Sequence, residues 1–110
     1  VILWGTGSAK REFINTRDIA SASIFLMNNY SAEETINVGT DEEVTIKELS
    51  EMIRDIVGFN GRIECDISKP DGMPRRILDS TKIHALGWSS SVALRDGLEE
   101  LYEDYISKRG

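Results

Sequence analysis

Residues 45–57 carry the clearest hydrophobic pattern in the chain. Apolar positions recur there at helical spacing until Gly58 interrupts them. Thr45 and Glu48 precede the run in the Ser/Thr-x-x-Glu arrangement of a capping box, in which each side chain accepts from the backbone of the other residue. The segment therefore predicts a well-defined amphipathic helix.

Three other segments predict helices. Residues 18–27 are apolar nearly all round, which suits a helix packed on two sides. Residues 80–86 form a short helix that Asp79 or Ser80 caps, and residues 92–106 place apolar side chains on one face and acidic side chains on the other.

Strands are predicted between these helices. Residues 62–67 alternate strictly, so that Cys65 and Ile67 share one face of a strand. Residues 11–15 and 35–40 are two further short strands. Strand and helix alternate without a linker or repeat, which predicts one mixed α/β unit over residues 1–110.

Composition excludes several classes of function. The 110 residues contain 13 Lys+Arg against 19 Asp+Glu, a net charge of −6. Nucleic-acid and anionic-membrane binding both need a positive surface, so neither partner is expected. One cysteine and one histidine leave no disulfide and no zinc set, which favours a reducing cytoplasm and no metal site. No apolar run reaches the ~20 residues that span a bilayer.

Catalytic motifs are missing from the sequence. It has no complete G-x-G-x-x-G, no P-loop, no G-x-S-x-G and no Tyr-x-x-x-Lys. Cys65 is expected to be a small core residue, because no basic residue is adjacent to activate its thiol. Six acidic residues are interpreted as solvated helix surface and helix-dipole compensation: Asp41, Glu42, Glu43, Glu48, Glu51 and Asp55.

Basic residues gather at two places in this acidic chain. One group follows a glycine turn and the other lies in a loop with two prolines: Lys10 and Arg11, then Lys69, Arg75 and Arg76. Guanidinium groups match phosphate oxygens bidentately, so the two groups favour a bound anion, with Trp4 as an aromatic wall. Ordinary surface charges beside a core tryptophan explain the pattern equally well.

Several segments together resemble a known family. They are residues 4–14, 18–20, 36–40, 69–75, 78–79 and 86–88. In this order they are similar to the C-terminal third of the GDP-L-fucose synthases, which are extended short-chain dehydrogenase/reductases. The Lys-Pro-Asp-Gly-x-Pro-Arg loop at 69–75 is the part that points to this family within the larger superfamily.

The resemblance implies a substrate-binding portion without the N-terminal Rossmann core. Whole enzymes of the family epimerise GDP-4-keto-6-deoxy-D-mannose at C3 and C5 and reduce C4 with NADPH. Their cofactor and catalytic residues lie in the N-terminal part, so no catalytic, cofactor-binding or metal residue is expected here, and the chain alone is expected to be inactive. The whole protein is expected to be a cytoplasmic homodimer that binds NADP, with residues 35–40 at the edge of its Rossmann sheet.

The resemblance also implies substrate contacts. Trp4 and Arg11 match positions that contact the GDP-sugar, and Lys69 and Asp71 lie in the loop that closes over the nucleotide. Arg75 is included as a contact, although it and Arg76 could equally hold the loop against Asp79. Two alternatives remain open: a related epimerase or dehydratase acting on a UDP- or dTDP-sugar, and a non-catalytic anion-binding module.

Overall fold

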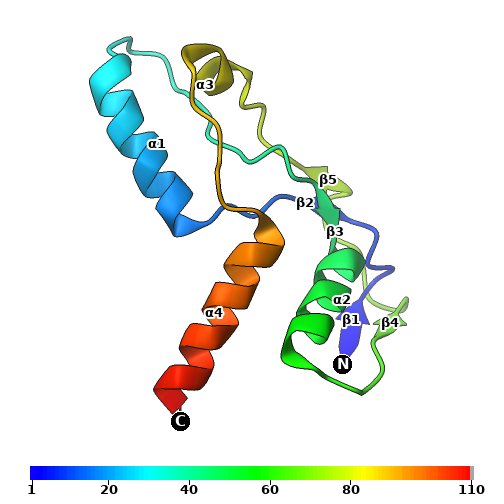
Figure 1. The fold of residues 1–110 in the computed structure, drawn as a ribbon. Coiled ribbons are helices and arrows are strands. Elements are labelled where there is room, and N and C mark those ends of the chain that lie inside the picture. Colours follow the sequence, from blue (N-terminus) through cyan, green and yellow to red (C-terminus); the bar gives the residue numbers. More distant parts are fainter. Residues whose placement is uncertain (110) are drawn as a thin grey trace.

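Helices and short strands alternate along residues 1–109, the part of the chain that this computed structural model describes (Figure 1). The strands are β1 (Ile2–Trp4), β2 (Lys10–Arg11), β3 (Val44–Thr45), β4 (Glu64–Asp66) and β5 (Arg75–Arg76). The helices are α1 (Thr16–Asn29), α2 (Ile46–Val57), α3 (Thr81–Leu86) and α4 (Leu94–Arg109). The predicted mixed α/β class is confirmed.

The strands form two small sheets. β1 pairs in parallel with β4, whereas the second sheet has the order β3-β2-β5, with β2 antiparallel to β3 and parallel to β5. In Figure 1 this second sheet lies between the α1 and α3 pair and the group formed by α2, β1 and β4. It is therefore the junction of the molecule.

Strand boundaries differ from the sequence pattern in several places, and β1 and β3 were not predicted. The strand expected at 11–15 is limited to β2, and β5 lies inside the segment 69–76 that was expected to be loop. Ile67 does not share the buried face of β4, because the chain turns after Asp66 and leaves Ile67 80% exposed. These strands are set by their pairing partners rather than by alternation.

Residues 35–40 form no strand within the described chain. Ile36 and Val38 instead pack against the core between α1 and α3. A strand requires a neighbour that accepts and donates its ladder hydrogen bonds, and no segment among residues 1–109 pairs with this one. Its place at the edge of a larger sheet stays a prediction.

The capping box of α2 is confirmed. Thr45 Oγ1 accepts from the Glu48 N–H at 3.0 Å, and Glu48 Oε1 accepts from the Thr45 N–H at 3.0 Å. Gly58 ends the helix at φ 73° in the left-handed conformation. Local sequence alone therefore placed both ends of α2.

The ends of α1 and α3 were predicted less completely. The Asn15 side chain caps α1 by accepting from the Arg17 N–H at 2.8 Å, a cap that the sequence analysis missed. At α3 the N-cap position is Ser80, whose side chain makes no capping hydrogen bond, and the Asp79 carboxylate instead accepts from the Thr81 N–H and hydroxyl. Of the two predicted capping residues of α3, Asp79 thus makes the hydrogen bonds and Ser80 holds the N-cap position.

A small core joins α1 to α3. Ala22, Ile83 and Trp88 are buried there, and the indole N–H of Trp88 donates to Ser21 Oγ at 3.1 Å. Partly buried residues surround these three: Ile14, Phe25, Leu26, Ile36 and Val38. This cluster holds the upper half of the molecule in Figure 1 together.

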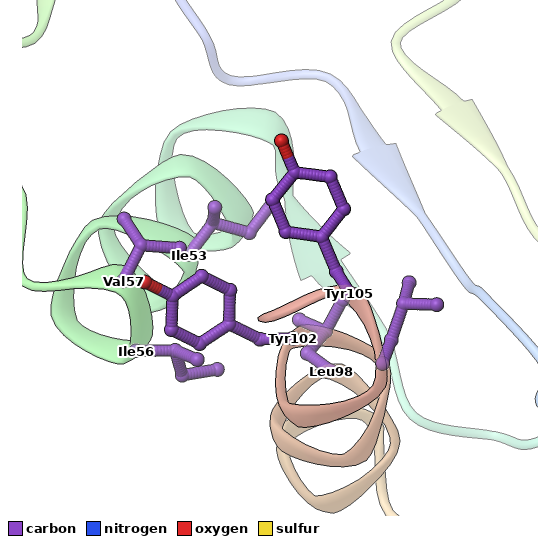
Figure 2. Close-up of a pocket in the computed structure, with 7 residues that line it drawn as sticks. Ile53, Ile56, Val57, Leu98, Tyr102 and Tyr105 are labelled. Carbon is purple, nitrogen blue, oxygen red and sulfur yellow. The ribbon is translucent and has the colours of Figure 1, made fainter. Parts of the chain in front are cut away.

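A second apolar region lies between α2 and α4. The two helices face each other across a cavity of about 380 Å³, and Figure 2 shows the rings of Tyr102 and Tyr105 pointing toward α2. Ile53, Ile56 and Val57 line it from α2, and Leu98 and Leu101 line it beside the tyrosines. The apolar faces predicted for both helices are confirmed, because side chains from both line this cavity.

Three acidic residues expected to be solvated instead connect distant elements. Asp41 accepts from Ser80 Oγ at 2.9 Å and lies 3.0 Å from His84 Nδ1, both at α3. Glu42 Oε2 accepts from the Leu94 N–H at 2.9 Å, at the start of α4. Their interpretation as solvated helix surface was wrong, because tertiary packing brings donors to them.

The third of these residues binds the small sheet. Glu43 accepts from Arg75 in β5 through both carboxylate oxygens, at 2.7 and 3.2 Å. The hydrogen bonds from Arg75 hold the pKa of Glu43 below its usual value. Residues 41–43 therefore bind α3, α4 and β5 in turn.

Asp18 ties the start of α1 to the segment between α3 and α4. Its buried carboxylate accepts from the Ser91 N–H and hydroxyl at 3.0 and 3.1 Å, and from the Val92 N–H at 3.1 Å. Burial alone raises the pKa of Asp18, but these hydrogen bonds together lower it below the ordinary value. The carboxylate is thus stabilised in its charged form.

Many large apolar side chains remain exposed in this structure. On α1, Ile24 is 61% and Met27 is 83% exposed, so only one side of the helix is covered within residues 1–109. The radius of gyration is 16.8 Å, against roughly 13 Å for a compact chain of this length. No helix within the same range is long and apolar enough to cross a membrane.

We expect Asp18→Asn to lower the free energy of unfolding by about 1–3 kcal/mol at neutral pH, because an amide offers two donors to a site built of donors. Because the folded pKa is lowered, the stabilisation is present above the ordinary value of 3.8 and is lost as pH falls through the folded pKa. Urea denaturation between pH 2 and 7 measures both effects. Asp55→Asn, at an exposed position, is the matched control and should change stability by less than about 0.5 kcal/mol. Equal losses in the two variants would contradict the role of Asp18.

We expect the chain to self-associate through the uncovered side of α1, because exposed apolar area favours burial against another surface. Met27→Lys should shift size-exclusion elution with light scattering toward the monomer at a given concentration. Asn28→Lys adds the same charge to an exposed neighbouring position and should leave the association constant nearly unchanged. A wild-type chain that stays monomeric at all concentrations would show that this surface is inert.

Candidate functional site

The loop of residues 69–76 folds back over the glycine turn that follows β1. Asp71 makes the principal contact: its carboxylate accepts from the Thr6 N–H and from the Thr6 hydroxyl, each at 2.8 Å. Both hydrogen bonds lower the pKa of Asp71 below its usual value, and the one from the Thr6 hydroxyl contributes most. The charged form of Asp71 therefore fixes the loop to the turn.

Gly5 makes this close approach possible. Its φ of 79° lies in the left-handed region, and a Cβ there would lie 2.2 Å from Asp71 Oδ1. Glycine avoids both the strained backbone and the collision. The sequence pattern indicates only a turn at Gly5, and the contact with Asp71 gives the tertiary reason for a glycine there.

Trp4 and Lys69 meet at the same place. Lys69 Nζ lies 5.3 Å from the centre of the Trp4 ring, within the range of a cation–π interaction. Trp4 is 69% exposed, so the alternative that it is a core residue is wrong. An exposed aromatic ring beside an ammonium group is an arrangement that can stack a ring and attract an anion.

Arg11 reaches the loop from β2. Its Nη1 donates to the carbonyl oxygen of Met73 and to that of Lys10, each at 2.7 Å. Both acceptors are neutral, so the positive charge of the guanidinium is not cancelled by them. Arg11 thereby positions the loop, and these contacts leave its charge unneutralised.

Arg75 is held by Glu43 and not by Asp79. The two hydrogen bonds to Glu43 raise the pKa of Arg75 above its usual value. Asp79 is occupied by Thr81 instead, so the expectation that the arginines might brace the loop against Asp79 was wrong. The brace exists, but its acceptor lies 32 residues earlier in the chain.

The structure therefore places the five predicted residues around one loop. Four of them lie at the glycine turn or on the loop that covers it, and Arg75 lies at the far end of the loop, in β5. Sequence reasoning missed Thr6 and Glu43, which hold the loop at its two ends. Thr6 lies between two glycines, a pattern that marks a turn in the sequence. Nothing near Glu43 in the sequence indicates that its partner is Arg75.

The cysteine borders this cluster at the glycine turn, and the histidine lies outside it. Cys65 is half-buried, with Sγ 3.5 Å from the carbonyl oxygen of Thr6, and His84 contacts Asp41. Within residues 1–109 no group of His, Cys, Asp and Glu side chains is placed to hold a metal ion. The cluster can bind and orient an anionic ligand, and it contains no paired acid and base.

The glycine turn does not fit a dinucleotide. A dinucleotide pyrophosphate binds at a helix N-terminus that follows the glycines. Here the turn leads into β2, whose Lys10 N–H donates to the Pro74 carbonyl oxygen at 2.8 Å. The turn at residues 5–8 is therefore not a dinucleotide-binding loop.

Comparisons with known proteins agree with this picture. Residues 1–39 match the sequence profile of the NAD dependent epimerase/dehydratase family. GDP-L-fucose synthase 1 of Arabidopsis thaliana is 48% identical over 96% of this chain and 33% of its own length. The probable GDP-L-fucose synthase 1 of Oryza sativa subsp. japonica is 52% identical over 96% of this chain and 32% of its own length.

A solved structure shares the fold. GDP-mannoheptose C4 reductase from Campylobacter jejuni, solved with NADP bound, has a TM-score of 0.86 and 38% identity, and the match covers 96% of this chain and 34% of that one. The chain thus spans about a third of the length of the proteins it matches. Residues 1–39 thus resemble the NAD dependent epimerase/dehydratase family, and the chain is similar to GDP-L-fucose synthases over nearly its whole length.

Proposed function

We propose that this chain is the nucleotide-sugar-binding portion of a GDP-L-fucose synthase. The observation that carries the proposal is the closure of the 69–76 loop over the glycine turn, through the hydrogen bonds between Asp71 and Thr6. It gathers at one place the residue types that a GDP-sugar requires. The similarity to plant GDP-L-fucose synthases supports this choice of nucleotide over UDP or dTDP.

Each residue of the cluster has a chemical role in the proposal. Trp4 offers a ring face, with Lys69 beside it to attract phosphate. Each oxygen of Asp71 accepts one hydrogen bond from Thr6, which leaves lone pairs on both oxygens for a ligand hydroxyl. Arg11 supplies charge for the diphosphate. Arg75, included as a contact from the sequence, acts through its pair with Glu43 to fix the end of the loop.

The whole protein would then carry out the reaction of its relatives. GDP-4-keto-6-deoxy-D-mannose is epimerised at C3 and C5 and reduced at C4, with NADP bound outside these 110 residues. This chain contributes binding and orientation, and on its own it is inactive. The same resemblance supports a cytoplasmic homodimer as the whole protein.

A chimera tests this function. We expect activity when these 110 residues replace the matching third of the Arabidopsis thaliana enzyme, because the substrate contacts then face a complete catalytic part. NADPH oxidation at 340 nm with GDP-4-keto-6-deoxy-D-mannose measures it, and Trp4→Ala should raise KM by roughly tenfold by removing a stacking surface. A chimera that binds NADPH normally but turns over only UDP- or dTDP-linked 4-keto sugars would overturn the assignment.

Gly5→Ala in this chimera should raise KM for the GDP-sugar, because the new Cβ displaces Asp71 from Thr6. Gly58→Ala is a closely matched control: its φ is 73°, and a Cβ there meets nothing within 4 Å. Both variants should lose about 1–2 kcal/mol of stability from left-handed backbone, and Gly5→Ala should lose more. Unchanged KM in a folded Gly5→Ala chimera would separate Asp71 from substrate binding.

A further inference from the structure

Glu12 lies directly after β2, the central strand of the three-stranded sheet. Each of its neighbours, β3 and β5, pairs with β2 over two residues only. Strands in globular proteins are usually about 3–10 residues long, so these ladders contribute few hydrogen bonds. Contacts beyond the strand ends therefore decide how firmly β3 and β5 are held against β2.

The Glu12 carboxylate connects to both neighbours beyond these ends. Its Oε1 accepts from the N–H of Leu78, just after β5, at 3.1 Å. Its Oε2 accepts from the N–H of Asp41, just before β3, at 3.3 Å. A carboxylate offers acceptors only, so it suits two donors. One side chain thereby links three segments at the point where backbone pairing stops.

Gly39 leaves the space that this carboxylate occupies. A Cβ at residue 39 would lie 2.6 Å from Glu12 Oε1 and 3.2 Å from Oε2. Both distances are shorter than an ordinary van der Waals contact, so the carboxylate would have to move. The approach of Glu12 to the 39–41 segment therefore requires a glycine at this position.

The segments that Glu12 links also carry the candidate site. Arg11 immediately precedes Glu12, and its guanidinium donates to the Met73 carbonyl oxygen in the 69–76 loop. Leu78 follows this loop, so its hydrogen bond to Glu12 fixes the chain where the loop ends. Glu12 thus sets the place of that end relative to the strand that carries Arg11.

The charge of Glu12 would have an opposite effect on an anionic ligand. Glu12 lines a cavity of about 320 Å³ together with Arg11 and Arg76. Among residues 1–109, none of the ion pairs includes Glu12. A free carboxylate beside two arginines weakens their attraction for an anion. Removing the charge alone would strengthen anion binding, whereas removing a positioning contact would weaken it.

We propose that Glu12 is a positioning residue for the candidate site, because it fixes the end of the 69–76 loop against β2 and so holds the loop in contact with Arg11. The inference rests on the proposed function for the identity of the ligand, a GDP-sugar. Glu12 is assigned no contact with that ligand. Its effect reaches the site through the loop.

Steady-state kinetics of the chimera separate this role from a general loss of stability. Glu12→Gln should raise KM for the GDP-sugar by at least about threefold, because the amide nitrogen is a donor and leaves one N–H group without an acceptor. The kcat and the KM for NADPH should change less than about twofold. A loss of folded enzyme would instead lower the apparent kcat and leave KM unchanged. Glu103→Gln, at an exposed position on α4, removes the same charge and should change neither constant.

Gly39→Ala displaces the carboxylate but keeps its charge. It should raise the same KM, and its combination with Glu12→Gln should add little, since both changes remove one contact. This second variant also keeps the proposal testable where Glu12→Gln does not fold. A lower KM in Glu12→Gln would show that Glu12 acts through its charge, and would overturn the proposal.

Amide hydrogen exchange of the chimera tests the contact without turnover. Glu12→Gln should speed exchange at the amides of Leu78 and Asp41 by at least about fivefold and leave α2 unchanged. Unchanged exchange at both amides, or faster exchange with an unchanged KM, would overturn the positioning role. Faster exchange in a chimera that has no activity even without the substitution would reject the proposed function and keep the role of Glu12 in fixing the loop.

Discussion

Three consecutive carboxylates, Asp41, Glu42 and Glu43, hold the separate parts of this structure together. Asp41 binds α3, Glu42 binds the start of α4 and Glu43 binds β5. The backbone of Asp41 has φ 62°, a conformation that asparagine and aspartate visit more readily than most residues. The hydrogen bonds of these three side chains fix the course of the backbone at residues 41–43. Because the apolar core is small, these polar connections determine where the helices lie relative to the small sheet.

The candidate site depends on one of these carboxylates, Glu43. The loop over the glycine turn is anchored by Asp71 at its start, by the Met73 carbonyl oxygen in its middle and by Arg75 at its end. Only the last anchor is an ion pair, and its acid is Glu43. The loop is therefore placed by hydrogen bonds that satisfy its own polar groups, while the charges of Lys69 and Arg11 remain available to a ligand.

Local sequence predicted some elements well because their stabilising contacts are local. The capping box begins α2 and Gly58 ends it, and each signal is confined to a few residues, so both ends of the helix are readable from the sequence. The site residues Trp4, Arg11, Lys69 and Asp71 came from their resemblance to a family, and the structure brings them to one loop. The edge strand expected at residues 35–40 stays a prediction, because a strand is defined by a partner and none pairs with them within the described chain.

The sequence by itself determined the α/β class and the ends of α2, and through the family resemblance it supplied the residues proposed for the candidate site. Helical periodicity, caps and turn glycines act over four or five residues, and the linear order contains them fully. Only the tertiary structure decided which acid neutralises which base. Glu43 lies 32 residues from Arg75, and the register of β2 with β5 alone separates Arg75 from Arg76. Adjacent residues in a strand face opposite sides, and which side holds a carboxylate is fixed by strands from elsewhere in the chain.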